Sequence, residues 1–163
     1  MKIKQPKKPT IRERDSLRVD IITPIPLWKD DIKYKLLEEI IKNNIIPETV
    51  TSSIVEIRIN KKGLPFSIEN YKRVYEFCKP VRTPKGYVFI RNAIFFFSRK
   101  PLNFYLSFGI SGGEEENHNI ISLSLETFQD SDVRETILRW FKNMCLLVKT
   151  DFARIQFYTA KER

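Results

Sequence analysis

The sequence predicts an α+β fold in which helices pack on one face of a mainly antiparallel sheet. Three stretches place apolar residues every three to four positions, which is the period of an amphipathic helix. Shorter segments alternate apolar and polar residues, as half-buried strands do. Three strand-like segments follow one another between residues 87 and 125 without a helix between them, which excludes a doubly wound parallel sheet. The predicted order of elements is β-α-β-α-β-β-β-α-β.

The chain begins with a strand, a helix and a second strand. Residues 17–21 alternate apolar and polar and predict a strand, which Pro24 and Pro26 end. The following helix has apolar residues at Trp28, Ile32, Leu36, Leu37, Ile40 and Ile41, and polar residues at Lys29, Lys33, Lys35, Glu38 and Glu39. Pro47 lies beyond the end of this helix. Residues 55–60 alternate again and predict the second strand.

Two more helices are predicted. The first spans residues 67 or 68 to 78, because Ser67 is suited to cap its start and Pro80 bars its continuation. Its apolar stripe is Ile68, Tyr71, Val74, Tyr75 and Cys78. The second begins near residues 130–132, where acidic side chains suit the positive end of the helix dipole. Its buried face is Val133, Ile137, Trp140, Phe141, Met144 and Val148.

Four strands belong to the second half of the chain. Residues 87–97 are rich in β-branched and aromatic side chains and predict a strand with a break or bulge near Arg91-Asn92. Alternation predicts strands over residues 104–108 and 121–125, and residues 152–158 predict the last strand. Short connections favour antiparallel pairing of neighbours in this part of the sheet.

The length of 163 residues predicts one folded domain over residues 16–163, preceded by a basic flexible tail over residues 1–15. The net charge is +9. Residues 1–14 hold six basic side chains and one acidic side chain, a net of +5, so the remaining residues hold +4. Because much of the positive charge lies in the tail, composition alone does not indicate a nucleic-acid-binding face.

The composition predicts a cytoplasmic protein without a membrane partner. No apolar run is long enough to span a bilayer, and the basic start of the chain lacks the apolar segment of a secretory signal. Cys78 and Cys145 fall within predicted helices and lack C-x-x-C spacing, so we interpret them as small apolar residues in a reducing compartment. A disulfide between them is the alternative that the sequence leaves open.

No catalytic, metal or cofactor site is predicted. The chain has a single histidine, and the common zinc and calcium motifs are absent. Residues 109–113 are rich in glycine and follow a strand, but the acidic Glu114, Glu115 and Glu116 come next and would repel a phosphate. The sequence therefore favours a protein that is not an enzyme, with a pair of carboxylates from distant segments as the remote alternative.

An acidic loop is the first candidate contact surface. Glu114, Glu115 and Glu116 form a negative run in a basic chain, and His118 and Asn119 follow them before the next strand. One interpretation is a solvated hairpin loop. The other is a negative patch that meets a basic surface on a protein partner, because complementary charges speed association and set the register of a complex.

An aromatic sheet surface is the second candidate. Phe95, Phe96 and Phe97 are consecutive, so a strand must direct Phe96 to the opposite face from its neighbours. If both sheet faces are covered, all three belong to the core. If one face is open, Phe96 joins Tyr105 and other tyrosines in an exposed surface that suits a protein partner or single-stranded nucleic acid.

The C-terminal part of the chain resembles the immunity protein 52 family of bacterial polymorphic toxin systems. The resemblance covers residues 103–160: a strand ending in glycine over residues 104–109, a Gly/Glu-rich loop, and an Asn that opens the alternating strand of residues 119–125. A helix and a short terminal strand follow, as in that family. The resemblance implies a cytosolic inhibitor that binds one cognate toxin.

We therefore expect a non-enzymatic binding protein, and most concretely an immunity protein that neutralises a toxin with a basic surface. The predicted partner-binding residues are Glu114, Glu115, Glu116, His118, Asn119, Phe96 and Tyr105. The alternative is a nucleic-acid-associated protein that uses the basic tail and an aromatic, basic sheet face.

Overall fold

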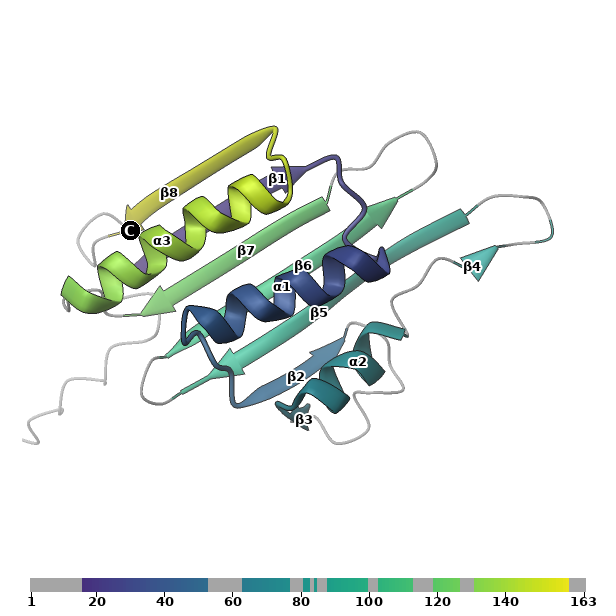
Figure 1. The fold of residues 1–163 in the computed structure, drawn as a ribbon, viewed down its shortest axis with the longest axis horizontal. Helices are drawn as coiled ribbons and strands as arrows, with labels where there is room; N and C mark the ends of the chain where they lie inside the picture. The colour runs from purple at the N-terminus through teal and green to yellow at the C-terminus, as the bar shows by residue number, and fades with distance from the viewer. Residues whose placement is uncertain are drawn as a thin grey trace, which may run out of the picture.

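The computed structural model describes residues 16–52, 63–76, 81–82, 84, 88–99, 103–112, 119–126 and 131–158. They form one antiparallel sheet with three helices on one of its faces, which confirms the predicted α+β class (Figure 1). Across the sheet the strands are β3 (Leu64–Pro65), β2 (Thr49–Ser52), β5 (Val88–Ser98), β6 (Phe104–Gly112), β7 (Asn119–Glu126), β1 (Ser16–Thr23) and β8 (Phe152–Tyr158), and β4 (Val81–Arg82) pairs with β5. The helices are α1 (Asp30–Lys42), α2 (Ile68–Glu76) and α3 (Ser131–Leu147).

The first strand lies between the last two. β1 pairs antiparallel with β7 on one side and with β8 on the other, so Asp20 faces Ser122 across one ladder and Arg154 across the other. These three residues are far apart in the sequence. The long-range pairing therefore decides which polar groups meet, and local patterns do not encode it.

Alternation along the strands separates a core face from an opposite face. In β7, Ile121, Leu123 and Leu125 are buried toward the helices. Their neighbours Ile120 and Ser124 are exposed, because successive side chains of a strand point to opposite sides. The helix-covered face therefore holds the hydrophobic core.

Helix α1 buries one residue that we predicted on its polar side. The Lys33 side chain lies between α1 and α2 and is only 4% exposed. Its Nζ is 3.0 Å from Glu76 Oε1 and 5.6 Å from the centroid of the Tyr75 ring. The prediction failed because α2 covers this side of α1, which helical periodicity does not reveal. Conversely, Ile41 was predicted on the apolar face and is exposed.

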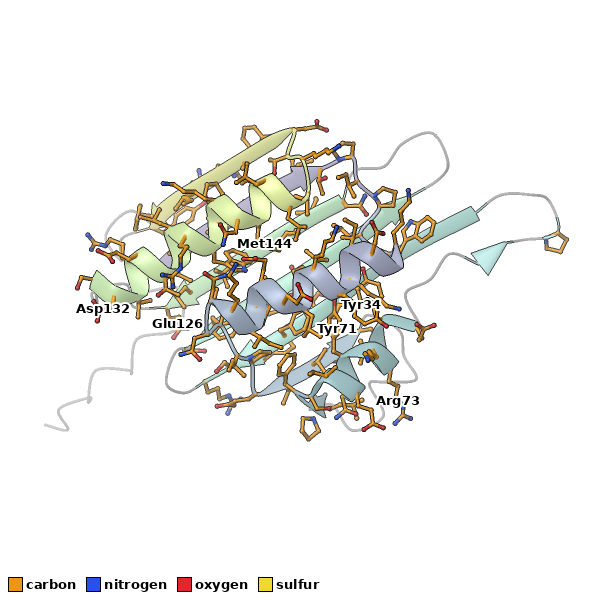
Figure 2. The ribbon with its side chains drawn as sticks, in the orientation of Figure 1. Tyr34, Tyr71, Arg73, Glu126, Asp132 and Met144 are labelled. Atoms are coloured by element: carbon orange, nitrogen blue, oxygen red, sulfur yellow. The ribbon has the colours of Figure 1, made fainter. Side chains whose placement is uncertain are left out.

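Helix α2 begins as predicted and is attached to α1. The Ser67 hydroxyl accepts a hydrogen bond from the Asn70 backbone N–H at 3.0 Å, which satisfies a free donor of the first turn. Tyr71 extends toward α1 (Figure 2), and its hydroxyl donates to the Lys33 carbonyl at 2.7 Å. Ile68, which we placed on the apolar stripe, is exposed at the start of the helix.

Helix α3 packs along α1. Arg139 Nε donates to Asn43 Oδ1 at 3.1 Å, and Asn143 Nδ2 donates to Glu39 Oε2 at 2.9 Å. The predicted buried residues Ile137, Trp140, Met144 and Val148 are buried, while Val133 and Phe141 are half-buried. The two long helices are thus joined by polar contacts above a shared apolar layer.

Two predictions about strands differ from the structure or fall outside its described residues. β5 pairs with β6 in one unbroken register through Arg91 and Asn92, so the predicted break or bulge is wrong. The predicted strand over residues 55–60 lies outside the described residues, and the observed β2 precedes it. In the described part of the chain, no helix is both long enough and apolar enough to cross a membrane.

Candidate functional site: the open face of the sheet

The sheet face opposite the helices is the candidate binding surface, and we call it the open face. No described helix covers it (Figure 1). Strand register places on it Ser16, Arg18, Asp20 and Ile22 of β1; Phe95 and Phe97 of β5; Tyr105 and Ser107 of β6; Ile120, Ser122, Ser124 and Glu126 of β7; and Phe152, Arg154, Gln156 and Tyr158 of β8. Phe97 is 41% exposed and Phe152 is 52% exposed. Large apolar side chains thus reach solvent on this face.

Three rings form an aromatic cluster at one side of the open face. Phe97 and Tyr105 are directly opposite each other on β5 and β6, with ring centroids 5.1 Å apart. Phe95 also stacks on Tyr105, with ring centroids 5.7 Å apart. Both separations fall in the range of favourable ring contacts. The aromatic cluster (Phe95, Phe97 and Tyr105) is therefore a contiguous, partly exposed surface.

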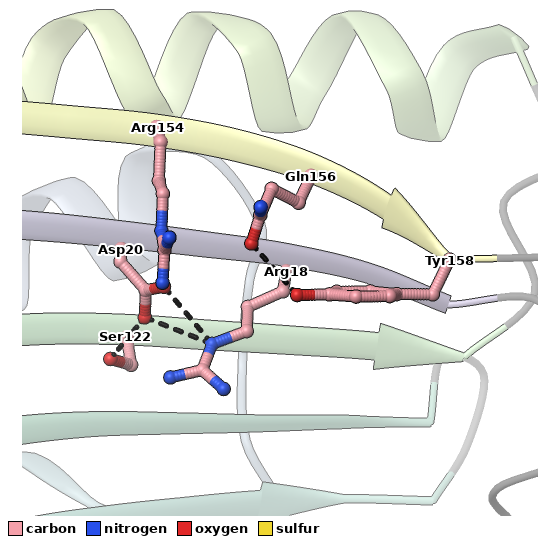
Figure 3. A network of polar contacts seen from close by, with 6 residues as sticks. All are labelled: Arg18, Asp20, Ser122, Arg154, Gln156 and Tyr158. Atoms are coloured by element: carbon pink, nitrogen blue, oxygen red, sulfur yellow. Dashed lines mark hydrogen bonds and ion pairs between the residues drawn. The ribbon is translucent and has the colours of Figure 1, made fainter. Parts of the chain in front are cut away.

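Two arginines and an aspartate form a polar network on the neighbouring strands (Figure 3). Arg18 Nε is 3.1 Å and 3.0 Å from the two Asp20 carboxylate oxygens. Arg154 approaches Asp20 Oδ2 through Nε at 3.1 Å and through Nη2 at 3.0 Å. Ser122 Oγ donates to Asp20 Oδ1 at 2.9 Å. The Asp20 side chain is only 7% exposed, so the arginines hold a nearly buried carboxylate from the solvent side.

The pKa of Asp20 reports the balance of forces in this network. Burial alone would raise the pKa of its carboxyl, because desolvation disfavours the charged form. Hydrogen bonds from Ser122, Arg18 and Arg154, together with the charge of Arg18, outweigh burial, and the net pKa lies below the ordinary value. Asp20 is therefore ionised at neutral pH, and its interactions favour the folded state.

The lowered pKa of Asp20 gives a testable pH dependence. A carboxyl whose folded-state pKa is depressed stabilises the fold above its unfolded pKa of about 3.9 and loses this contribution as pH falls through the folded pKa. We expect Asp20→Asn to be less stable than the wild type at pH 7, with the difference shrinking below about pH 4. Urea unfolding of both proteins between pH 7 and pH 2.5 measures the difference. A difference in unfolding free energy that stays constant across this pH range would contradict the lowered pKa of Asp20.

The aromatic cluster and the arginines lie in the same cross-strand rows. One row runs from Arg18 through Ser124 to Tyr105 and Phe97, and the next from Asp20 through Ser122 and Ser107 to Phe95. Arg18 and Tyr105 are two strands apart, a separation of about 10 Å. Only serines lie between the two groups in these rows. The aromatic cluster and the arginines therefore form one continuous surface that a single partner can cover.

The structure corrects one predicted site residue on the sheet. Phe96 is completely buried beneath the helices, where its ring contacts those of Tyr71 and Phe108. It cannot join an exposed surface, because β5 directs it to the core and its neighbours to the open face. Tyr105 does lie on the open face, but with Phe95 and Phe97 instead of Phe96.

The predicted loop residues have two different outcomes. Glu114, Glu115, Glu116 and His118 lie outside the described residues, so the acidic loop stays a prediction. Asn119 is described and is completely buried at the start of β7, and neither of its side-chain polar atoms is hydrogen-bonded to another described residue. Its side chain therefore cannot contact a partner, and the prediction for this residue is wrong.

Sequence reasoning missed the arginine network and placed the wrong phenylalanine of residues 95–97 on the exposed face. Four consecutive apolar residues, 94–97, carry no alternation from which to assign faces. Asp20, by contrast, stands between Val19 and Ile21 in an alternating strand, a pattern that marks it as pointing away from the core. Arg18, two residues earlier in the same strand, shares that face by local alternation. Arg154 and Ser122 required knowledge of which strands pair.

The titratable groups of the described chain do not form a recognisable catalytic arrangement. No group of three or more His, Cys, Asp or Glu side chains among the described residues is placed to hold a metal ion. Cys145 is a free thiol, and burial raises its pKa, so it is not activated as a thiolate. Burial likewise raises the pKa of Tyr105, despite an opposing hydrogen bond with Ser107, so its phenol is neutral at pH 7.

No family model, no curated protein and no solved structure matches the chain.

Proposed function

We propose that the protein is a non-enzymatic binding protein, and specifically an immunity protein that neutralises a cognate bacterial toxin in the cytoplasm by direct contact. The observation that carries the binding role is the open face, where Phe95, Phe97 and Tyr105 stack in a partly exposed cluster. The narrower proposal of an immunity protein rests on the resemblance of residues 103–160 to that family.

The physical properties of the open face support a protein partner. Rigid aromatic side chains are favoured in the centres of protein interfaces, because they bury a large area and lose little conformational freedom on binding. The cluster is already held by ring contacts, so binding would order few further rotamers. Because the cluster projects from a sheet with its core on the other face, a partner could cover it without disturbing the fold.

The charges of the open face favour protein over nucleic acid. Arg18 and Arg154 share the nearly buried Asp20, so two positive charges are partly cancelled by one negative charge. Binding to a phosphate backbone generally requires several uncompensated basic groups. The aromatic cluster alone would suit single-stranded bases, but the described basic groups beside it are too few to follow a strand.

The test uses the C-terminal domain of a large protein encoded beside this gene. We expect that domain to be toxic when expressed alone and harmless when this protein is co-expressed. The double variant Phe97→Asp/Tyr105→Ala should weaken binding by at least about 30-fold, because it replaces central aromatic contacts with a desolvated charge. The matched control is Leu146→Asp on α3, which is 80% exposed on the helix side and should bind as the wild type does.

Two outcomes would contradict this proposal. The first is full protection and wild-type affinity in the double variant while its melting temperature is unchanged. The second is binding to a single-stranded oligonucleotide that weakens steeply with salt and is lost in the same variant, which would favour the nucleic-acid alternative. The acidic loop of Glu114, Glu115 and Glu116 remains a predicted second contact, for a basic part of the same toxin.

A further inference from the structure

We propose that Arg18 and Arg154 form a binding site for a carboxylate side chain of the protein partner. The site rests on the proposed function, because it lies on the open face beside the aromatic cluster. Beyond the proposed function, it specifies the group that the partner presents. That group is one Asp or Glu, about two strand spacings from the partner residue that covers the aromatic cluster.

The first observation is the set of donors that the network leaves unused. Among the described residues, Arg18 makes hydrogen bonds through Nε alone, so both of its Nη atoms remain available. Arg154 uses Nε and Nη2 on Asp20, and its Nη1 remains available. The two Nη atoms of one guanidinium form a planar fork that matches the two oxygens of a carboxylate.

The second observation is that the guanidinium groups are held in place before any partner binds. Both arginines contact the same carboxylate of Asp20, which is fixed in turn by Ser122 (Figure 3). Their side chains are 51% and 45% exposed, so they are restrained and still accessible. A restrained arginine loses less rotamer freedom on binding than a solvated one, and more of the interaction appears as affinity.

The third observation is the local charge. Within the network, two guanidinium groups and one carboxylate leave an excess of one positive charge, which a single carboxylate neutralises. Glu126 of β7 lies on the same face opposite Ser16, and its Oε2 accepts a hydrogen bond from Asn103 Nδ2 at 2.6 Å. Gln156 adds a donor beside Arg18, because Tyr158 Oη donates to its Oε1 at 2.7 Å and its Nε2 remains available.

The test compares two variants of Arg18 against the toxin domain used above. We expect Arg18→Gln to raise the dissociation constant by about 10- to 100-fold, because it removes a charge-assisted fork from the interface. Arg18→Lys should give an intermediate loss, since it keeps the charge and can still pair with Asp20 but lacks the fork. The control is Lys42→Gln, a 72% exposed lysine on α1, which should bind as the wild type does.

A charge-swap experiment then identifies the carboxylate. Arg18→Glu should abolish protection, and one Asp→Arg or Glu→Arg change on the surface of the toxin domain should restore it. Rescue that occurs only in the paired combination measures direct coupling between the two side chains. In the full experiment, each acidic surface residue of the toxin domain is replaced in turn and tested with Arg18→Glu. If no combination restores protection, the proposed carboxylate site is overturned.

The outcomes separate this inference from the proposed function. Wild-type affinity in Arg18→Gln and Arg18→Lys, with binding lost in the aromatic double variant, overturns the carboxylate site and leaves the proposed function standing. Wild-type affinity in the aromatic variant as well overturns the open face as the contact surface. Binding of a single-stranded oligonucleotide that depends on Arg18 would assign the site to phosphate instead. The melting temperature of each variant shows whether weaker binding results from loss of folding. If Arg18→Gln does not fold, the affinity of Arg18→Lys tests the site.

Discussion

Phe96→Ala is expected to lower the free energy of unfolding by about 3–5 kcal/mol, whereas Phe97→Ala should lower it by about 1 kcal/mol or less. The two residues are adjacent in β5 but lie on opposite faces of the sheet. Phe96 is completely buried against the rings of Tyr71 and Phe108, so its removal leaves a cavity that the helices cannot fill without shifting. Phe97 is 41% exposed and leaves space that water can occupy.

Urea unfolding monitored by far-UV circular dichroism measures both changes. Each variant is its neighbour's control, because the strand, the residue type and the chemical change are the same. Equal destabilisation would mean that the open face is covered in the folded protein, and the proposed contact surface would then be part of the core. A larger loss at Phe97 than at Phe96 would reverse the face assignment of β5.

Trp140→Ala is expected to cost about 3–5 kcal/mol as well, because the Trp140 side chain is completely buried on the core side of α3. Its indole N–H has no hydrogen-bond partner among the residues that the structure describes, so that group adds nothing favourable to the fold there. Trp140→Phe should therefore be much less harmful than Trp140→Ala, since it removes the unsatisfied donor and keeps most of the apolar area.

Leu146→Ala provides the control for α3, since Leu146 is 80% exposed and its truncation should change stability by less than about 0.5 kcal/mol. Thermal and urea unfolding of the three variants give the comparison. A small effect of Trp140→Ala would mean that α3 is not firmly packed on the sheet, and the helix face would then compete with the open face as a contact surface.

Much of the architecture could be predicted from local patterns. Ile121, Leu123 and Leu125 alternate with polar residues in β7, and a strand with this pattern must bury one face only. Leu36 and Ile40 recur at helical spacing in α1 and are buried as expected. These patterns determine which residues can share a face, because side-chain direction within one element follows from backbone geometry alone.

Patterns failed where two faces were equally apolar or where a second element covered a polar residue. Residues 94–97 are all apolar, so the sequence could not show that Phe96 enters the core while Phe95 and Phe97 leave it. Lys33 has the spacing of a solvated residue, yet α2 buries it and supplies Glu76 as its partner. Packing between elements decides such cases, because it depends on which surfaces meet.

The sequence by itself determined the fold class, the three helices, the strands with alternating residues and the absence of the common metal and phosphate motifs. Only the tertiary structure decided the candidate site. Arg18 lies two residues from Asp20 on β1 itself. Ser122 and Arg154 meet Asp20 because β1 inserts between β7 and β8, and no local interaction specifies that insertion. Strand order depends on the total apolar area that the sheet buries against its helices. Residues from the whole chain contribute to that area, so no short segment determines it.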